Sequence, residues 1–279
     1  MMNNAIPIAS PPWTTLGKKL ESTVRRAVFD FQMLENITTL AVALSGGKDS
    51  LALLFLLKAL SGRGFLPFSI TAIHVSGEFS CGAQVSEKYL SSICNAIDVP
   101  LIIKTSSQKL ETLECYSCSR ERRNLLFDAA KAAGIHTIAF GHHLDDNAET
   151  VLMNLLHKGE FAGQLPKIYM HTYDVTIIRP LIYVREAEIR EFAKLYGFAR
   201  VTCCCPVGQR SLRKKTDDLL EHIEALYPNA RANIAHAGLT YGSTKATRSP
   251  TCQQNKKAAS SAKELNWLLP VLTNCPSSG

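Results

Sequence analysis

The sequence of 279 residues lacks a hydrophobic run long enough to span a membrane. Its longest apolar run, residues 51–60, is interrupted by Lys58, whereas a spanning helix needs about 20 apolar residues. It also lacks a charged N-terminal leader followed by a hydrophobic segment and a small-residue cleavage site. These absences argue against membrane insertion and secretion, and they predict a cytoplasmic protein.

Without an export signal, the nine cysteines are expected to be thiols, metal ligands or catalytic groups instead of disulfides. Two groups stand out. Cys115 and Cys118 form a C-x-x-C pair, and residues 203–205 are three consecutive cysteines before Pro206. The pair is compatible with a zinc half-site, a redox pair or an iron–sulfur site, although the order of elements does not match a thioredoxin fold.

The sequence also lacks the P-loop motif of kinases and GTPases. The hexapeptide SGGKDS at residues 45–50 is similar to it, but Val42 stands where that motif has its first glycine, and Asp49 follows the lysine. The apolar run 40–44 predicts a buried strand, and 49–60 predicts a helix. The hexapeptide therefore lies at a helix N-terminus, where free N–H groups and Lys48 favour phosphate binding. An ordinary Gly-rich turn is the structural alternative.

Strands alternate with helices along the middle of the chain, which predicts an α/β fold with a doubly wound, mostly parallel sheet. Ligands of such sheets bind at the carboxyl ends of the strands. The expected strands are 40–44, 69–75, 101–104, 137–140 and 175–178, and the expected helices are 15–35, 49–60, 84–97, 119–133, 145–157, 185–196 and 209–226.

The composition suggests three parts. Residues 1–36 are expected to be an N-terminal helical segment, and 37–228 a nucleotide-binding domain that carries the cysteines. Residues 229–279 are expected to be a largely disordered extension, because Ser, Thr, Lys, Gln and Ala dominate from position 243 onward.

Polar residues gather where the fourth strand meets the following helix. Asp145 as N-cap, with Glu149 in the first turn, would stabilise that helix without any further function. The functional interpretation places His143 and Asp146 near nucleotide phosphates, magnesium or a target base. His74, at the end of the second strand, is either structural or part of an adenosine pocket.

A net charge of +7 is compatible with a polyanionic partner. Basic residues form two clusters, each beside a cysteine group. A charged cluster is usually a solvated surface, but this placement favours an RNA-phosphate surface. The clusters consist of Arg120, Arg122 and Arg123, and of Arg210, Arg213, Lys214 and Lys215.

The hexapeptide resembles the pyrophosphate loop (PP-loop) of the N-type ATP pyrophosphatases, which split ATP into AMP and pyrophosphate. The resemblance implies an adenine-nucleotide α-hydrolase-like fold. It also implies that Lys48 neutralises phosphate charge and that Asp49 helps to hold Mg²⁺. The residues that it assigns to the β and γ phosphates are Ser45, Gly46, Gly47 and Ser50.

Further motifs, spread from residue 45 to about 213, resemble the tRNA 2-thiocytidine synthetases. They are Cys115-Tyr116-Ser117-Cys118-Ser119-Arg120, Arg122-Arg123, Gly141-His142-His143-Leu144-Asp145-Asp146, Arg179-Pro180-Leu181 and Arg185-Glu186. The resemblance implies a [4Fe-4S] cluster on three cysteines, two of them Cys115 and Cys118. We expect Cys205 to be the third, because Pro206 fixes the turn after it, with Cys203 as the alternative.

The implied reaction is ATP-dependent thiolation of cytidine 32 in the tRNA anticodon loop, by adenylation of the base and sulfur transfer at the cluster. The implied partners are tRNA and a sulfur donor such as a cysteine desulfurase, and a homodimer is left open.

Three other functions are compatible with parts of the pattern. A lysidine-synthetase-type ligase would use the same loop but has no need of the C-x-x-C pair. A cluster-free thiolase would carry a persulfide on Cys118. A non-catalytic tRNA-binding protein with a decayed loop is disfavoured by the intact Lys48 and Asp49.

Overall fold

The computed structural model describes residues 6–77, 87–107, 115–198 and 212–243, with side chains 115–118 left out. The chain divides into Met1–Thr244 and a second unit, Lys245–Gly279, which lies outside the described residues. The disorder predicted from position 243 therefore remains a prediction. None of the described helices combines the length and apolar character needed to cross a membrane.

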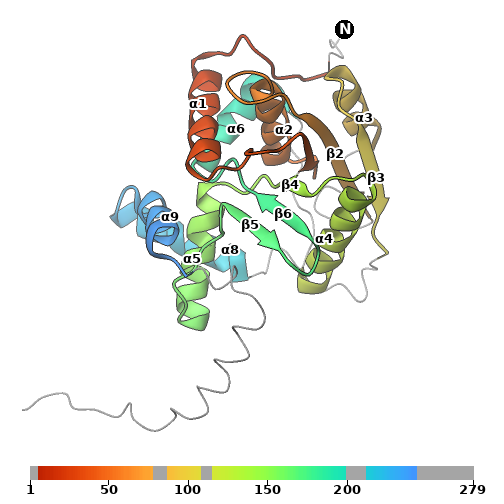
Figure 1. Cartoon of the computed structure of the whole chain (residues 1–279). Coiled ribbons are helices and arrows are strands. Elements are labelled where there is room, and N and C mark those ends of the chain that lie inside the picture. Colours follow the sequence, from red (N-terminus) through yellow and green to blue (C-terminus); the bar gives the residue numbers. More distant parts are fainter. Residues whose placement is uncertain (1–5, 78–86, 108–114, 199–211, 244–279) are drawn as a thin grey trace, which may run out of the picture. The chain divides into compact units, whose positions relative to one another are not determined.

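A six-stranded sheet organises the described residues, with strand order β3-β2-β1-β4-β6-β5. Five strands run parallel and β5 pairs antiparallel with β6, so the predicted doubly wound, mostly parallel α/β fold is confirmed (Figure 1). The strands are β1 Thr39–Ala43, β2 Ser69–Ser76, β3 Leu101–Thr105, β4 Thr137–Ala139, β5 Lys167–Met170 and β6 Val175–Ile178.

The helices cover both faces of this sheet. The helices α1 Thr15–Asp30, α2 Lys48–Leu60, α3 Glu87–Ala96 and α6 Glu186–Leu195 contribute to one core cluster, and α4 Cys115–Ala132 contributes to the other. Strand β1 contributes to both clusters, because Leu40 and Val42 point to one face and Ala41 to the other.

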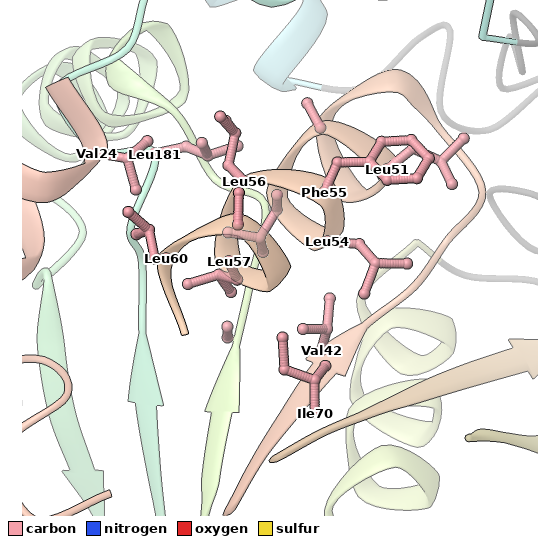
Figure 2. Packing of buried hydrophobic residues seen from close by; sticks show 14 of the residues in the cluster. Val24, Val42, Leu51, Leu54, Phe55, Leu56, Leu57, Leu60, Ile70 and Leu181 are labelled. Atoms are coloured by element: carbon pink, nitrogen blue, oxygen red, sulfur yellow. The ribbon is translucent and has the colours of Figure 1, made fainter. Parts of the chain in front are cut away.

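Residues 50–60 of helix α2 are buried except for Lys58, because the sheet, α1 and α6 enclose the helix. Figure 2 shows Leu54 near Val42 of β1, while Leu60 lies beside Val24 of α1 and Leu56 beside Leu181. Its first turn, which follows the predicted phosphate loop, is thereby held firmly at the carboxyl end of β1.

Three further helices form a second group. Helix α5 Leu144–Lys158 packs against α8 Leu212–Leu226 and α9 Ala230–Tyr241 through a small apolar cluster that includes Leu152, Leu220 and Ala235. The first part of the predicted extension, 229–279, is thus an ordered helix. Gly238 allows the close approach, since an added Cβ would collide with Val151.

Two elements differ from the sequence-based expectation, and the first of them carries the cysteine pair. Helix α4 begins at Cys115 instead of residue 119, so Cys115 and Cys118 belong to a first helical turn and not to a loop. Strand β5 was not predicted, because its four residues carry little pattern of their own and owe their conformation to pairing with β6.

Candidate active site

The segment 45–50 joins β1 to α2 and is held in shape from within. Ser50 Oγ accepts a hydrogen bond from the Gly46 N–H at 3.1 Å and donates one to the Gly47 carbonyl at 3.0 Å. Gly46 has φ 83°, a conformation that favours glycine. The N-cap of α2, Gly47, provides no side-chain cap, which leaves the N–H groups of the first turn available to an anion.

The loop lies where the strand order reverses, between β1 and β4, the usual ligand position in open α/β sheets. Gly141 follows β4 and makes this arrangement possible. An added Cβ would lie 3.1 Å from the carbonyl carbon of Asp49 and 3.2 Å from the amide nitrogen of Ser50. The turn after β4 is therefore packed directly against the start of α2.

Lys48 is held between two carboxylates. Its Nζ lies 3.0 Å from Asp49 Oδ2 and 2.8 Å from Glu186 Oε1. Burial favours a lower pKa for Lys48, but Asp49 and Glu186 outweigh it and raise that pKa, so the ammonium remains charged. Glu186 had no expected role beyond its place in the family motif, although its position at the start of the helix that follows β6 was a usable signal.

His143 connects the loop to α5. Its Nδ1 accepts a hydrogen bond from the Asp146 N–H at 3.3 Å, and the backbone N–H of His143 donates to Asp146 Oδ2 at 3.0 Å. His143 is therefore the N-cap of α5, and the alternative in which Asp145 caps this helix is wrong. The neutral ring then carries its proton on Nε2, which lies 3.5 Å from Asp146 Oδ2 and 3.9 Å from Asp49 Oδ1.

Two carboxylates beside His143, those of Asp145 and Asp146, interact with neighbouring protein groups. Burial favours a higher pKa for Asp146, but His143 and Arg213 outweigh it and lower that pKa. Asp145 is buried, and its Oδ2 accepts the Glu186 N–H at 2.7 Å. Asp145 thus joins the start of α5 to the start of α6.

The Oδ1 atom of Asp49 is buried without a hydrogen-bond partner among the described residues. A buried carboxylate oxygen without a partner is costly unless a cation or donor approaches it. The described residues contain no group of three or more side chains arranged to hold a metal. Asp49 therefore suits a Mg²⁺ ion whose remaining ligands are phosphate oxygens and water.

His74 is fully buried at the end of β2. Its Nδ1 lies 2.7 Å from the Leu44 carbonyl, so Nδ1 carries the proton and Nε2 has no partner among the described residues. Burial lowers its pKa, and the charge of Arg122 lowers it further. The hydrogen bond to the Leu44 carbonyl favours a structural role for His74. Because Nε2 has no partner among the described residues, a role in an adenosine pocket stays a prediction.

The predicted RNA-binding residues have different surroundings. Arg120, Arg123 and Lys215 are exposed, while Arg122 donates to the Val75 carbonyl at 3.5 Å and Arg210 lies outside the described residues.

Two members of the second cluster have partners within the chain. Arg213 forms ion pairs with Glu149 at 2.7 Å and Asp146 at 3.2 Å, and Lys214 pairs with Asp218 at 2.8 Å. Arg213 thereby fastens α8 to the start of α5.

The cysteine residues are only partly located. Cys115 and Cys118 are three residues apart in the first turn of α4, and residues with this spacing share one side of a helix. Cys203 and Cys205 lie outside the described residues, so the third ligand remains a prediction.

A glycine-rich Lys-Asp loop at the switch point of a parallel sheet defines the PP-loop domain, and the family model described by that term matches residues 18–202. The tRNA-cytidine(32) 2-sulfurtransferase of Geobacter metallireducens is 34% identical over 79% of this chain and 88% of its own length. That of Stenotrophomonas maltophilia is 35% identical over 82% and 79%. The chain belongs to the PP-loop family that contains these sulfurtransferases, which confirms the resemblance found in the sequence.

A solved structure has the same fold. The U34-tRNA thiolase NcsA from Methanococcus maripaludis, described with its [4Fe-4S] cluster, superposes with a TM-score of 0.66 at 23% identity. The match covers 80% of this chain and 78% of that one.

Proposed function

We propose that the protein is an ATP-dependent tRNA sulfurtransferase that replaces the O2 atom of cytidine 32 by sulfur. The observation that carries the proposal is the arrangement around Asp49. Lys48 and His143 both approach this carboxylate, at the switch point of the sheet and in a chain of this family.

Two half-reactions account for the exchange of oxygen for sulfur. In the first, the cytidine O2 attacks the α-phosphate of ATP, pyrophosphate leaves, and the base carries AMP on O2. In the second, a sulfide-level nucleophile attacks C2 and AMP leaves with that oxygen. Activation of the base and delivery of sulfur are separate tasks, which explains why the chain has both a phosphate loop and a cysteine group.

The loop residues are assigned to the phosphates of ATP. The N–H groups of the first turn of α2 and the hydroxyl of Ser45 donate to the β and γ phosphates, while Gly46 and Gly47 allow close approach. The Ser50 hydroxyl joins them by releasing the Gly47 carbonyl, to which it donates in the structure. Lys48 changes partner from Glu186 to phosphate, Asp49 holds Mg²⁺, and His143 with Asp146 keeps Asp49 oriented.

Cys115, Cys118 and one cysteine of residues 203–205 are assigned to a [4Fe-4S] cluster. A thiolate pair in a first helical turn fits this assignment, since the positive end of the helix dipole stabilises thiolates. When bound, the cluster supplies an iron with an open coordination position for sulfur.

Arg120, Arg122, Arg123, Arg210 and Lys215 are assigned to the tRNA backbone, and a cysteine desulfurase is the proposed class of sulfur donor. The target base is reached in an anticodon loop, where bases are unstacked. A protein with this substrate acts in the cytoplasm.

The decisive test is mass spectrometry of tRNA nucleosides from cells that lack the gene, complemented with the wild type or with Asp49→Asn. We expect 2-thiocytidine to disappear in the deletion, to return with the wild type, and to stay absent with Asp49→Asn. Because Asp49 Oδ1 has no hydrogen-bond partner among the described residues, the variant should fold normally and differ only in activity.

The alternatives give different results. Loss of lysidine with 2-thiocytidine retained would identify a ligase. Full restoration by Asp49→Asn would contradict the role of the loop. A cluster-free persulfide thiolase would retain activity in protein that contains no iron.

A further inference from the structure

Arg213, in the first turn of α8, is engaged by two carboxylates of α5. Its Nε lies 2.7 Å from Glu149 Oε2, and its Nη2 lies 3.2 Å from Asp146 Oδ1. Nη2 also donates to the backbone carbonyl of Asp146 at 3.4 Å. The side chain of Arg213 is 44% exposed, which by itself would suit a contact with RNA. Its guanidinium is nevertheless directed at the two acidic side chains of the neighbouring helix.

The two carboxylates depend on this cation. Asp146 and Glu149 are three residues apart on α5, so they lie on the same side of that helix and repel each other. Burial raises the pKa of Glu149 and the charge of Asp146 adds to this effect, while Arg213 opposes it. Loss of Arg213 would remove the ion pair on Asp146 Oδ1 and leave the repulsion in place. The position of the Asp146 carboxylate is therefore set from α8.

Asp146 in turn orients His143, which faces the phosphate loop. Its other oxygen, Oδ2, accepts the backbone N–H of His143 at 3.0 Å, and the Asp146 N–H donates to His143 Nδ1 at 3.3 Å. These two bonds fix the ring, whose Nε2 lies 3.9 Å from Asp49 Oδ1. Because that oxygen has no hydrogen-bond partner among the described residues, the surroundings of Asp49 depend on where His143 points.

Helix α8 is itself held in place by a buried arginine of α9. Arg231 Nη2 lies 2.7 Å from Asp217 Oδ1, and its Nε lies 2.9 Å from Glu224 Oε2. Both carboxylates belong to α8 and are about two helical turns apart. The Nη1 atom of Arg231 also lies 3.8 Å from Glu149 Oε1 on α5. Arg213 therefore reaches α5 from a helix that is fixed at several points.

We propose that Arg213 is a positioning residue of the nucleotide site and not a contact of the tRNA backbone. By holding Asp146, it keeps His143 directed at Asp49. One cation that faces two carboxylates has no excess positive charge to offer a phosphodiester. Two oriented N–H donors for two carboxylates also require a guanidinium instead of an ammonium. This inference rests on the proposed function, in which Asp49 holds the Mg²⁺ of ATP.

The first experiment needs neither tRNA nor activity. In full-length protein with nitrogen-labelled histidine, the ring signals of His143 are followed by NMR. The test variants are Arg213→Gln, which removes the charge, and Arg213→Lys, which keeps it. Lys158→Gln, at the exposed end of α5, is the control with the same change of charge. The signals of His74, in the core, report whether each variant is folded.

In the wild type, His143 Nδ1 is an acceptor and the neutral ring carries its proton on Nε2. We expect the ring signals in Arg213→Gln to shift toward those of a histidine that exchanges between its two tautomers. Lys158→Gln should retain the wild-type signals, and Arg213→Lys should lie between, because it keeps the charge without the oriented donors. Unchanged His143 signals in a folded Arg213→Gln would overturn the proposal. If that variant does not fold, the same criterion applies to Arg213→Lys.

The second experiment asks whether Arg213 acts through Asp146. Binding of ATP with Mg²⁺ is measured by isothermal titration calorimetry for Arg213→Gln, Asp146→Asn and the double variant. If Arg213 acts through Asp146, each single variant weakens binding several-fold, and the double variant binds no more weakly than Asp146→Asn alone. If the two effects multiply in the double variant, Arg213 acts by another route and the proposal is wrong.

The third experiment separates positioning from contact with tRNA. Binding of an unmodified tRNA transcript is measured over a range of salt concentrations. Arg213→Gln should retain the wild-type slope of log K against log salt. Lys215→Gln, at an exposed position of the same helix, should reduce that slope by about one.

A slope reduced by Arg213→Gln would make Arg213 a tRNA contact and would overturn the proposal. Failure of the wild type to bind tRNA would contradict the proposed function instead. The His143 signals would still decide on the role of Arg213, because they are recorded without tRNA.

Discussion

At the residue scale, Lys48 shows that the positive charge of the loop is already balanced before phosphate binds. Glu186 and Asp49 both contact its ammonium group, and Glu186 has a second cationic partner in Arg190 at 3.0 Å. The lysine can therefore exchange Glu186 for phosphate without leaving that carboxylate unpaired.

We predict that Glu186→Gln binds ATP more tightly, by up to about fivefold, because a partly exposed ion pair that competes with the ligand is worth roughly 0.2–1 kcal/mol. The measurement is isothermal titration calorimetry. Glu191→Gln, on the exposed side of the same helix, is the control and should match the wild type. Weaker binding by Glu186→Gln would mean that this carboxylate helps to hold the nucleotide or its metal.

The histidines predict a dependence of stability on pH. Burial lowers the pKa of both His74 and His142 in the folded protein, whereas in the unfolded chain a histidine has a pKa of about 6.5. The unfolded state thus binds protons more readily below that pH. The free energy of unfolding should fall between pH 7 and pH 5.5, with a slope of at most about 1.4 kcal/mol per pH unit for each histidine.

Urea unfolding at several pH values measures this effect. His142→Gln should have a shallower pH dependence than the wild type in this range. His171→Gln removes an exposed histidine and is expected to retain the wild-type slope. Equal slopes in all three proteins would show that His142 titrates normally when folded.

At the element scale, the site depends on how closely β4 and α2 approach. Gly141→Ala would place a methyl group 3.1–3.2 Å from backbone atoms of Asp49 and Ser50, and neither backbone can move without shifting the first turn of α2. We predict a loss of stability of about 1–3 kcal/mol, together with weaker ATP binding.

Gly238→Ala is the matched control, because it also crowds a helix contact, between α9 and α5, but not the loop. Both variants should be less stable in thermal unfolding. At a temperature where both remain folded, only Gly141→Ala should bind ATP more weakly. If ATP binding changes equally in the two, the close contact at Gly141 has no special bearing on the loop.

At the scale of the whole molecule, one buried helix supports both the core and the site. Leu56 of α2 is fully buried, and its replacement by alanine should cost about 2–5 kcal/mol. Leu66 is 75% exposed, and Leu66→Ala should change stability by less than about 0.5 kcal/mol. Chemical denaturation of both variants tests this prediction, and a small effect at Leu56 would contradict the enclosed position of α2.

The sequence by itself determined the alternation of strands and helices, the position of the phosphate loop and the family. These features rest on local patterns: an apolar strand such as β1, a glycine-rich turn, and a largely apolar helix such as α2. Strand β5 and the early start of α4 could not be derived in this way, because the former depends on pairing with β6 and the latter begins in a segment without apolar periodicity.

Only the tertiary structure decided which side chains meet at the carboxyl edge of the sheet. Sequence patterns predict that the carboxyl ends of the parallel strands lie at one edge of the sheet. They do not specify that Glu186 reaches Lys48 or that Arg213 pairs with Asp146. Such contacts join residues far apart in the chain, and they follow from strand order and helix packing. The contact between Arg179 and His142 is of the same kind, since β4 and β6 become neighbours only when the sheet assembles.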